Sequence, residues 1–301
     1  MEEKLLNFLK MNEVEYKENL WLKNYSSVKI GGMASLVLFP DTVEKIITAL
    51  DFLVENKIDY KIIGRLTNIL IEDKAFDTVF LKTDNLKGVI MLEDGIRLFA
   101  GEKLSVLSYP LAKEGIGGFS ALSGIPGSIG GNVRNNAGAF GVEISDILRS
   151  VTVYSPIEKR ILKLSSEDAE FGYRKSVFSS LPLIILYADF HIAYDSPERI
   201  REHILEVKQR RIKTQPLEFP SLGSVFKRPK GDYAARLIDA ANLKGYAIGG
   251  AEVSSKHAGF IVNKGNATFE DFLSLIEYTK SIVFQKYGIL LEEEIEIYKG
   301  K

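Results

Sequence analysis

The clearest candidate for chemistry is a glycine-rich segment that runs from Ser123 to Gly141. Its glycines are Gly124, Gly127, Gly130, Gly131, Gly138 and Gly141. Because glycine has no side chain, successive backbone N–H groups can turn into one concavity and approach an anion closely. The alternative is a plain cluster of turns, but the density of glycine favours a diphosphate site.

A second candidate is the segment Gly64–Asn68, which follows a predicted strand at 60–63. In α/β proteins, ligands bind at the carboxyl ends of strands. A short loop that contains Gly, Thr and Asn suits that position. Alone, this segment is equally typical of an ordinary strand-to-loop exit.

Basic residues gather between positions 196 and 245, where eleven Lys and Arg stand against six Asp and Glu. Such a cluster suits a phosphorylated substrate. Those in the predicted helix 197–213 are also typical of a solvated helix face. The loop residues Lys227, Arg228 and Lys230 are the better candidates.

The elements that must position these residues alternate between strand and helix. Residues 36–63 predict a βαβ unit, and Asp94-Gly95 predicts a tight hairpin between two short strands. Residues 115–141 lack periodicity and predict a loop. Further strands are expected at 78–82, 147–154, 160–164, 183–193, 259–262 and 289–298, and further helices at 197–213, 232–243 and 269–287. The predicted class is α+β, divided into domains 1–83, 84–195 and 196–301.

Composition narrows the functional classes. The chain has 301 residues, 46% apolar and 26% charged, with a net charge of −1, which argues against a general affinity for nucleic acid. It has no cysteine and three dispersed histidines, so no metal site is expected. The first residues lack the pattern of a secretory signal, and no stretch approaches the length of a membrane span. A cytoplasmic protein without membrane insertion is predicted.

Five ordered motifs together resemble those of the UDP-N-acetylenolpyruvoylglucosamine reductase family. They are Gly64–Leu70, Ser123–Gly141, Phe171–Ser176, Gly223–Pro229 and Leu291–Ile295. Their order and spacing match from about residue 24 to the C-terminus, and the length is similar to the shorter, type II form of the family. An ordered set is far more specific than any single motif.

The resemblance implies an FAD-binding fold of the vanillyl-alcohol-oxidase type in two subdomains, followed by a C-terminal α/β domain that binds substrate. It implies that FAD takes a hydride from NADPH and passes it to the enolpyruvyl group of a UDP-linked amino sugar, forming UDP-N-acetylmuramate for peptidoglycan. Arg174, Ser224 and Glu294 match the catalytic positions, with the serine as proton donor. No nucleic acid and no obligate protein partner are expected.

The resemblance also implies two sets of binding residues. The FAD set is Gly64, Arg65, Leu66, Thr67, Asn68, Ser123, Gly124, Gly127, Ser128, Gly130, Gly131, Asn136, Ala137 and Gly138. The substrate set is Tyr173, Lys227, Arg228, Lys244, Lys256 and Asn263.

The chain departs from the family pattern at several positions. Arg65 and Leu66 replace two glycines of the first loop, and Thr67 replaces a serine. Arg228 stands where the family usually has asparagine, and Phe140 where a tyrosine is frequent. These changes bear on the FAD and UDP contacts rather than on the three catalytic positions.

Two other functions fit parts of the sequence. The same FAD fold can serve an oxidase of a small alcohol or sugar, although the basic loop 227–230 favours a phosphorylated substrate. A nucleotide-binding module without catalysis would need only the glycine-rich loops.

Overall fold

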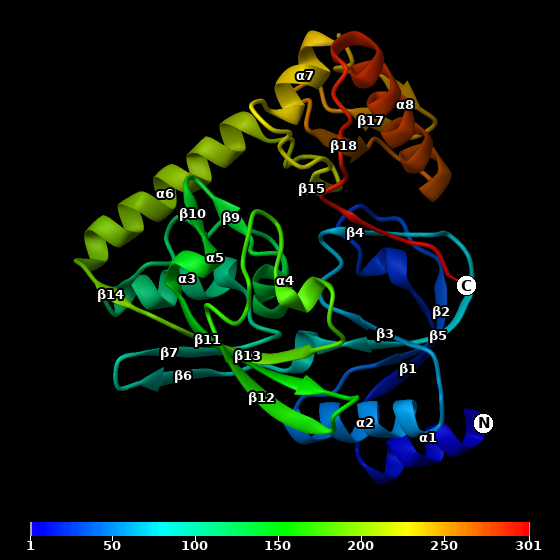
Figure 1. Ribbon diagram of the computed structural model, residues 1–301, viewed down its shortest axis with the longest axis vertical. Coiled ribbons are helices and arrows are strands. Elements are labelled where there is room, and N and C mark those ends of the chain that lie inside the picture. The colour runs from blue at the N-terminus through cyan, green and yellow to red at the C-terminus, as the bar shows by residue number, and fades with distance from the viewer. Residues whose placement is uncertain (1, 301) are drawn as a thin grey trace. The chain divides into compact units, whose positions relative to one another are not determined.

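The computed structural model, whose elements are labelled in Figure 1, describes residues 2–300. Packing divides these residues into two units. Unit 1 holds the residues up to Glu18, then Ser35–Arg65 and Asp77–Gln209. Unit 2 holds Asn19–Ala34, Leu66–Phe76 and the chain from Arg210 onward. The division into domains 1–83, 84–195 and 196–301 stays a prediction, and its end residues Met1 and Lys301 lie outside the described part.

A four-stranded sheet has the order β1-β2-β5-β3. Its strands are β1 (Tyr16–Trp21), β2 (Met33–Leu38), β3 (Tyr60–Ile63) and β5 (Phe76–Lys82). The predicted strand–helix–strand order is present as β2, α2 (Val43–Glu55) and β3, but β5 lies between the two strands and pairs with β3 in parallel. The hydroxyl of Thr42 caps α2 by accepting from the amide of Lys45 at 3.2 Å.

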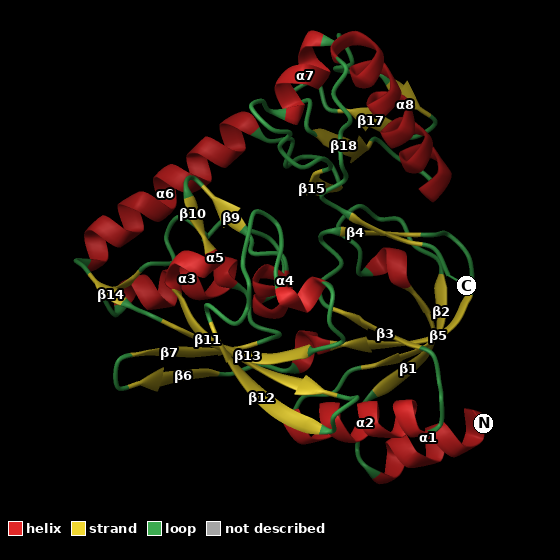
Figure 2. Ribbon diagram, viewed as in Figure 1, coloured by secondary structure: helices red, strands yellow, loops and turns green. Residues whose placement is uncertain are grey.

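Helix α1 (Glu2–Met11) packs beside α2 on one side of this sheet, as Figure 2 shows. The rings of Phe8 and Phe52 stack with their centroids 4.0 Å apart. Helix α1 was not predicted from the sequence.

A second sheet in unit 1 has the order β12-β11-β13-β7-β6 with antiparallel neighbours. Its strands are β6 (Val89–Leu92), β7 (Gly95–Phe99), β11 (Leu148–Ser155), β12 (Arg160–Ser165) and β13 (Ile184–Phe190). The predicted hairpin forms, but its turn residues are Glu93 and Asp94, and Gly95 is the first residue of β7. A Cβ at Gly95 would lie 2.5 Å from the carbonyl oxygen of Phe190, so this glycine serves close strand packing.

The residues 115–141 are not a plain loop, and that prediction was wrong. They contain α4 (Ile129–Arg134) and the short strands β8 (Ile116–Gly117) and β9 (Gly138–Ala139). The helix was missed because two of its six residues are glycine, which lowers helix propensity and hides the pattern. The hydroxyl of Ser128 caps it by accepting from the amide of Gly131 at 3.4 Å.

The remaining elements of unit 1 are short. They are η2 (Thr83–Asn85), α3 (Leu104–Lys113), β10 (Val142–Glu143), α5 (Ile144–Ile147), η3 (Val177–Ser179) and β14 (Ala193–Tyr194). Helix α6 (Pro197–Thr214) begins as predicted, and the boundary between the units falls within it, after Gln209.

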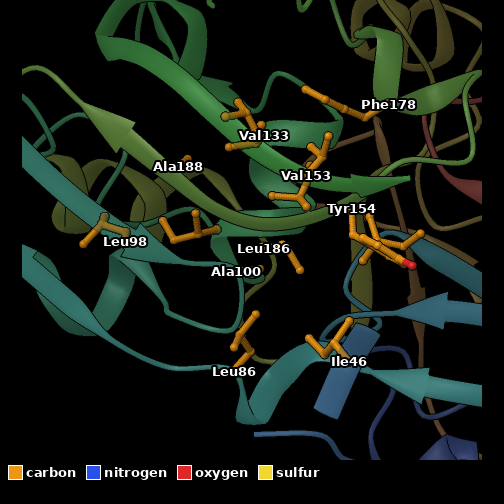
Figure 3. Packing of buried hydrophobic residues seen from close by; sticks show 14 of the residues in the cluster. Ile46, Leu86, Leu98, Ala100, Val133, Val153, Tyr154, Phe178, Leu186 and Ala188 are labelled. Carbon is orange, nitrogen blue, oxygen red and sulfur yellow. The ribbon is translucent and has the colours of Figure 1, made fainter. Parts of the chain in front are cut away.

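One hydrophobic cluster forms the core of unit 1 (Figure 3). It joins Ile46 of α2 and Leu86 to Val153 and Leu186 of the second sheet and to Val133 of α4. The glycine-rich segment is therefore fixed against the main core by its helix.

Unit 2 is built on the antiparallel sheet β15-β18-β17-β16 and two helices. Its elements are η1 (Leu22–Asn24), β4 (Ile69–Ile71), β15 (Ser221–Ser224), α7 (Ala234–Ala240), β16 (Ala247–Ile248), β17 (Ala251–Val253), β18 (Phe260–Asn263), α8 (Phe269–Tyr287) and β19 (Glu296–Tyr298). The predicted strand 289–298 is paired in a sheet only at β19, which runs parallel to β4.

The early segments of unit 2 are held by side-chain hydrogen bonds to distant parts of the chain. The carboxylate of Asp73 accepts from the amides of Gly31 at 2.9 Å and Phe269 at 2.7 Å. The hydroxyl of Ser27 donates to the carbonyl of Ser221 at 2.7 Å. These bonds explain why two early segments pack with the C-terminal part of the chain.

A buried ion pair crosses the second sheet of unit 1 and gives a pH prediction. Arg97 donates to both carboxylate oxygens of Asp189 at 2.7 and 3.1 Å. Burial alone would raise the pKa of Asp189, but the Arg97 guanidinium outweighs it and holds that pKa below its ordinary value. The pair therefore stabilises the fold above the unfolded-state pKa of about 3.9, and this contribution is lost as the pH falls through the folded-state pKa.

We expect Asp189→Asn to lower the free energy of unfolding by about 2 kcal/mol at neutral pH, because it leaves Arg97 without its carboxylate. Urea unfolding at pH 7 and near pH 3 measures the difference between variant and wild type. The difference should shrink at acid pH, and a difference that does not change with pH would contradict this role.

Candidate functional site

The first glycine loop and the glycine-rich segment meet in unit 1. Gly64 follows β3, and a Cβ there would lie 2.9 Å from the hydroxyl oxygen of Ser128. A side chain at this position would press on the hydroxyl that caps α4, and glycine avoids this contact. Two predicted FAD-binding residues are thus brought together.

A buried lysine fixes the Gly64 loop. Lys82 donates to the carbonyl of Gly64 at 2.6 Å and to the carboxylate of Asp84 at 2.6 Å. Arg65 approaches the same carboxylate at 3.4 Å. Burial lowers the pKa of Lys82, an effect that Asp84 partly offsets. Ionic contacts of Lys82 and Arg65 therefore hold this loop, and Arg65 stands at a position where the family more often has glycine.

We expect Lys82→Met to lower the free energy of unfolding by about 3 kcal/mol, because it removes the donor to the Gly64 carbonyl and leaves the Asp84 carboxylate with the longer contact from Arg65. Urea denaturation is the measurement. The exposed neighbour Lys87 gives a matched control, since Lys87→Met should change stability by no more than about 0.5 kcal/mol. Equal effects of the two substitutions would show that Lys82 does not support the loop.

The next residue of the loop, Leu66, has a φ of +53° and a side chain only 3% exposed. Its carbonyl accepts from the amide of Ser27 at 3.1 Å. Burial and this bond hold a conformation that glycine would adopt without strain. Leu66, Thr67 and Asn68 belong to unit 2, whereas Gly64 and Arg65 belong to unit 1.

The glycine-rich segment is positioned mainly by hydrogen bonds of its backbone. The amide of Gly130 donates to the carbonyl of Ala100 at 2.9 Å, and a Cβ at Gly130 would meet the Ala100 side chain at 3.2 Å. Ala137 bonds through its amide to the carbonyl of Asn132 at 2.8 Å, and Gly127 has a φ of +109°. Contacts of Ser123, Gly124, Gly131 and Gly138 with FAD stay predictions.

Asn136 is buried, and both its side-chain nitrogen and its side-chain oxygen form hydrogen bonds within unit 1. Its amide nitrogen donates to Glu143 at 2.9 Å and to the carbonyl of Gly172 at 3.1 Å, and its oxygen accepts from the amide of Ser145 at 3.0 Å. This side chain therefore organises the segment, and a direct contact with FAD stays a prediction.

Arg174 lies at the tip of a tight turn closed by paired backbone bonds between Gly172 and Lys175. Its guanidinium donates to the carbonyls of Asn136 at 3.3 Å and Gly138 at 3.2 Å and lies 3.7 Å from the Glu143 carboxylate. The predicted catalytic arginine is therefore anchored to the glycine-rich segment. The guanidinium carbon also lies 5.0 Å from the ring centre of the predicted substrate residue Tyr173.

Ser224 and Glu294 lie on neighbouring segments of unit 2. Ser224 ends β15, and the carbonyl of the following residue, Val225, accepts from the amide of Glu294 at 2.7 Å. The amide of Lys227 donates to the carbonyl of Glu292 at 2.8 Å, which continues the pairing. The sequence places these residues seventy positions apart, and the fold makes their backbones adjacent.

Asn68 ties the first loop to the predicted catalytic glutamate. Its side-chain nitrogen donates to the carbonyl of Glu294 at 3.1 Å, and its own carbonyl accepts from the amide of Glu296 at 2.9 Å. No sequence motif indicated this link, because the partners are more than two hundred positions apart.

The remaining predicted substrate residues lie in unit 2. Three are lysines paired with exposed acids or a carbonyl: Lys227 with Glu292 at 3.4 Å, Lys244 with Asp239 at 2.6 Å, and Lys256 with the carbonyl of Ile212 at 2.7 Å. Such exposed pairs are weak, so these lysines can exchange partners for an anionic ligand.

Arg228 and Asn263 differ from the lysines. The guanidinium carbon of Arg228 lies 4.6 Å from the centre of the Tyr233 ring. Asn263 is buried, donates to the carbonyl of Val28 at 2.9 Å and accepts from the amides of Gly265 and Ala267. Its side chain serves the fold, and a substrate contact by it stays a prediction.

Across residues 2–300, no cluster of three or more His, Asp or Glu side chains is arranged to hold a metal ion. In the same part of the chain, no helix combines the length and the apolar character that a membrane span requires.

The fit of FAD to unit 1 rests on chemistry visible at the glycine-rich segment. A Cβ at position 64 would lie 2.9 Å from the Ser128 hydroxyl oxygen, so the absence of a side chain at Gly64 lets the two segments approach. Gly130 and Gly131 bring further backbone without side chains to the same place, which suits a diphosphate.

Two known domain families match the chain. The FAD binding domain matches residues 34–160, and the C-terminal domain of UDP-N-acetylenolpyruvoylglucosamine reductase matches residues 215–298. The chain is therefore an FAD-dependent oxidoreductase. The predicted α+β class is confirmed, with an FAD binding domain followed by the C-terminal domain of the reductase family.

Relatives match over nearly the whole chain. The UDP-N-acetylenolpyruvoylglucosamine reductase of Petrotoga mobilis is 42% identical over 95% of both chains, and that of Caldanaerobacter subterraneus is 40% identical over 99% of this chain and 98% of its own. The crystal structure of the reductase from Thermus caldophilus superposes with a TM-score of 0.77 at 31% identity, covering 95% of this chain and 99% of that one. The chain belongs to the UDP-N-acetylenolpyruvoylglucosamine reductase family, and the predicted family and the FAD cofactor are confirmed.

Proposed function

We propose that this chain uses NADPH to reduce the enolpyruvyl group of UDP-N-acetylglucosamine enolpyruvate, giving UDP-N-acetylmuramate. The main support is the match to reductases of this name along nearly the entire length of both chains. When bound, FAD supplies the hydride transfer that side chains alone cannot provide. The reaction adds a hydride to one carbon of the double bond and a proton to the other.

Arg174 is proposed to stabilise the charge that develops on the substrate. Hydride addition to an enol ether conjugated with a carboxylate pushes negative charge into an enolate. A fixed guanidinium beside that carboxylate would stabilise the charge without reorganising. The two backbone carbonyls that hold Arg174 support this role, because they fix the side chain before substrate binds.

Ser224 is proposed to give the proton to the enolate carbon. A serine hydroxyl is a weak acid in water, but an enolate carbon is strongly basic and can take its proton when the hydroxyl is well placed. Glu294 is proposed to steady the hydroxyl and restore its proton. The hydrogen bond between the Val225 carbonyl and the Glu294 amide supports a joint role for Ser224 and Glu294, because it holds their backbones side by side.

The place of the reaction in the cell follows from its substrate. A UDP-linked sugar carries a charged diphosphate, which crosses a lipid bilayer only at great cost. We therefore propose that the enzyme works in the cytoplasm on a peptidoglycan precursor and so supports cell shape and division. NADPH and the UDP sugar are the only partners that this reaction requires.

Isotope labelling tests the proposal. With deuterated NADPH and heavy water together, the product should carry one deuterium on each carbon of the former double bond. NADPH oxidation that is the same with and without the UDP sugar would contradict the proposal. Rapid oxygen consumption with a small alcohol would favour the oxidase instead.

A further inference from the structure

Strand β6 is an open edge of the second sheet of unit 1, and it carries exposed apolar side chains. It ends the strand order β12-β11-β13-β7-β6, and its strand partner among residues 2–300 is β7 (Figure 1). Val89, Ile90 and Met91 are 42%, 46% and 51% exposed. An edge strand presents a row of backbone N–H and C=O groups to which a further strand can bond. Strand β6 is therefore a candidate interaction surface.

The opposite edge of the same sheet differs from β6 in charge. Strand β12 carries Arg160 and Lys163, whose side chains are 63% and 60% exposed. Charged side chains on an edge strand disfavour pairing with another chain. No charged residue interrupts the run 88–92 that contains β6. Of the two edges, β6 is therefore the one suited to accept another strand.

The pairing with β7 shows which backbone groups of β6 point outward. The amide of Phe99 donates to the carbonyl of Gly88 at 3.0 Å, so Gly88 bonds toward β7. Bonding direction alternates along an antiparallel strand, so Ile90 also bonds toward β7. Val89 and Met91 then direct their N–H and C=O groups away from the sheet. These two residues can bond to a strand added at the edge.

The side chains of Val89 and Met91 continue an apolar face of unit 1. In the register with β7, Val89 lies opposite Leu98 and Met91 lies opposite Ile96. Leu98 and Ile96 belong to the hydrophobic core and are fully buried. Because opposite residues in an antiparallel pair share a face, the exposed side chains of β6 extend this row beyond the core.

The charges at the two ends of β6 are complementary to each other. Lys87 precedes the strand and Glu93 follows it, and both are exposed, with no ion-pair partner among the described residues. If two β6 strands pair antiparallel with Ile90 on the two-fold axis, Lys87 of each copy faces Glu93 of the other. The same register places Val89 opposite Met91, so outward groups meet outward groups. A register shifted by two residues keeps these hydrogen bonds but separates the charges.

We propose that two copies of this chain associate through antiparallel pairing of their β6 strands, which joins the two sheets into one. The outward backbone groups, the exposed apolar side chains and the end charges all favour the register centred on Ile90. The strand is short, so the interface is small and the dimer is expected to be weak. None of its residues belongs to the predicted FAD or substrate sets.

Sedimentation velocity of the holoenzyme over a wide range of concentrations tests the proposal. Wild type should show a monomer–dimer equilibrium. Met91→Lys should raise the dissociation constant about tenfold or more, because symmetry places the new charge in the interface twice. Arg160→Glu on the opposite edge is the matched control and should leave the constant unchanged. The flavin content of each variant shows that its fold is intact.

A charge exchange tests the register. Glu93→Lys brings lysines opposite each other and should weaken association, and adding Lys87→Glu should restore it. Hydrogen exchange at the amides of Val89 and Met91 should slow as the dimer forms. A wild type that stays monomeric at every concentration would overturn the proposal, and so would a dimer that neither Met91→Lys nor Glu93→Lys weakens.

Discussion

Ser224→Ala is expected to slow the oxidation of reduced flavin by the UDP-enolpyruvyl sugar at least about 100-fold, the scale for loss of a general acid. Flavin reduction by NADPH should stay nearly normal, because that half-reaction needs no proton from this hydroxyl. Anaerobic stopped-flow absorbance of the two half-reactions measures both rates.

Ser221, at the other end of β15, provides the control for this experiment. Its backbone carbonyl bonds to Ser27, but Ser221→Ala leaves the backbone in place and should change neither half-reaction. Equal slowing of both half-reactions in Ser224→Ala would show that the serine supports the flavin site in general and does not donate the proton.

Arg174→Ala should also act mainly on the second half-reaction, with a loss of about 100- to 1000-fold, because the developing enolate charge loses its fixed partner. Arg174→Lys keeps the charge but cannot reproduce the planar fork that bonds two carbonyls, so it should restore only part of the rate. Rates of product formation in single turnovers measure the effect.

The neighbouring Lys175 is exposed in the same turn, so Lys175→Ala is the matched control and should react at the wild-type rate. An Arg174→Ala enzyme that forms product at the wild-type rate would remove this residue from the site.

Local signals predicted several elements well. Helix α8 spans Phe269–Tyr287 as expected, since Thr268 and Asp271 form a capping box and Gly288 ends the helix with a φ of +69°. The start of α6 was equally clear from Ser196-Pro197. In these cases the residues that decide the boundary lie within four positions of it.

Tertiary pairing could not be predicted in the same way. Nothing near β2 or β3 shows that β5 lies between them, because strand order is decided by packing over the whole sheet. Residues 289–298 alternate like a strand, yet only β19 has a sheet partner, β4, more than two hundred positions away.

For the site, the family motifs predicted candidate residues, and the structure shows the contacts that surround these residues. The motifs did not distinguish Asn136, whose side-chain amide is hydrogen-bonded within the fold, from Asn132, whose side-chain nitrogen has no partner among the described residues. They also gave no sign of Lys82, because a lysine in a strand pattern looks like a surface residue until its burial is known. Burial and long-range partners are the information that a single sequence lacks.

The most direct test of the reductase activity is an anaerobic absorbance measurement on the purified holoenzyme. One equivalent of NADPH should bleach the flavin band, and the UDP-enolpyruvyl sugar should then restore it with formation of UDP-N-acetylmuramate. A flavin that NADPH bleaches and that stays bleached after the sugar is added would contradict the activity.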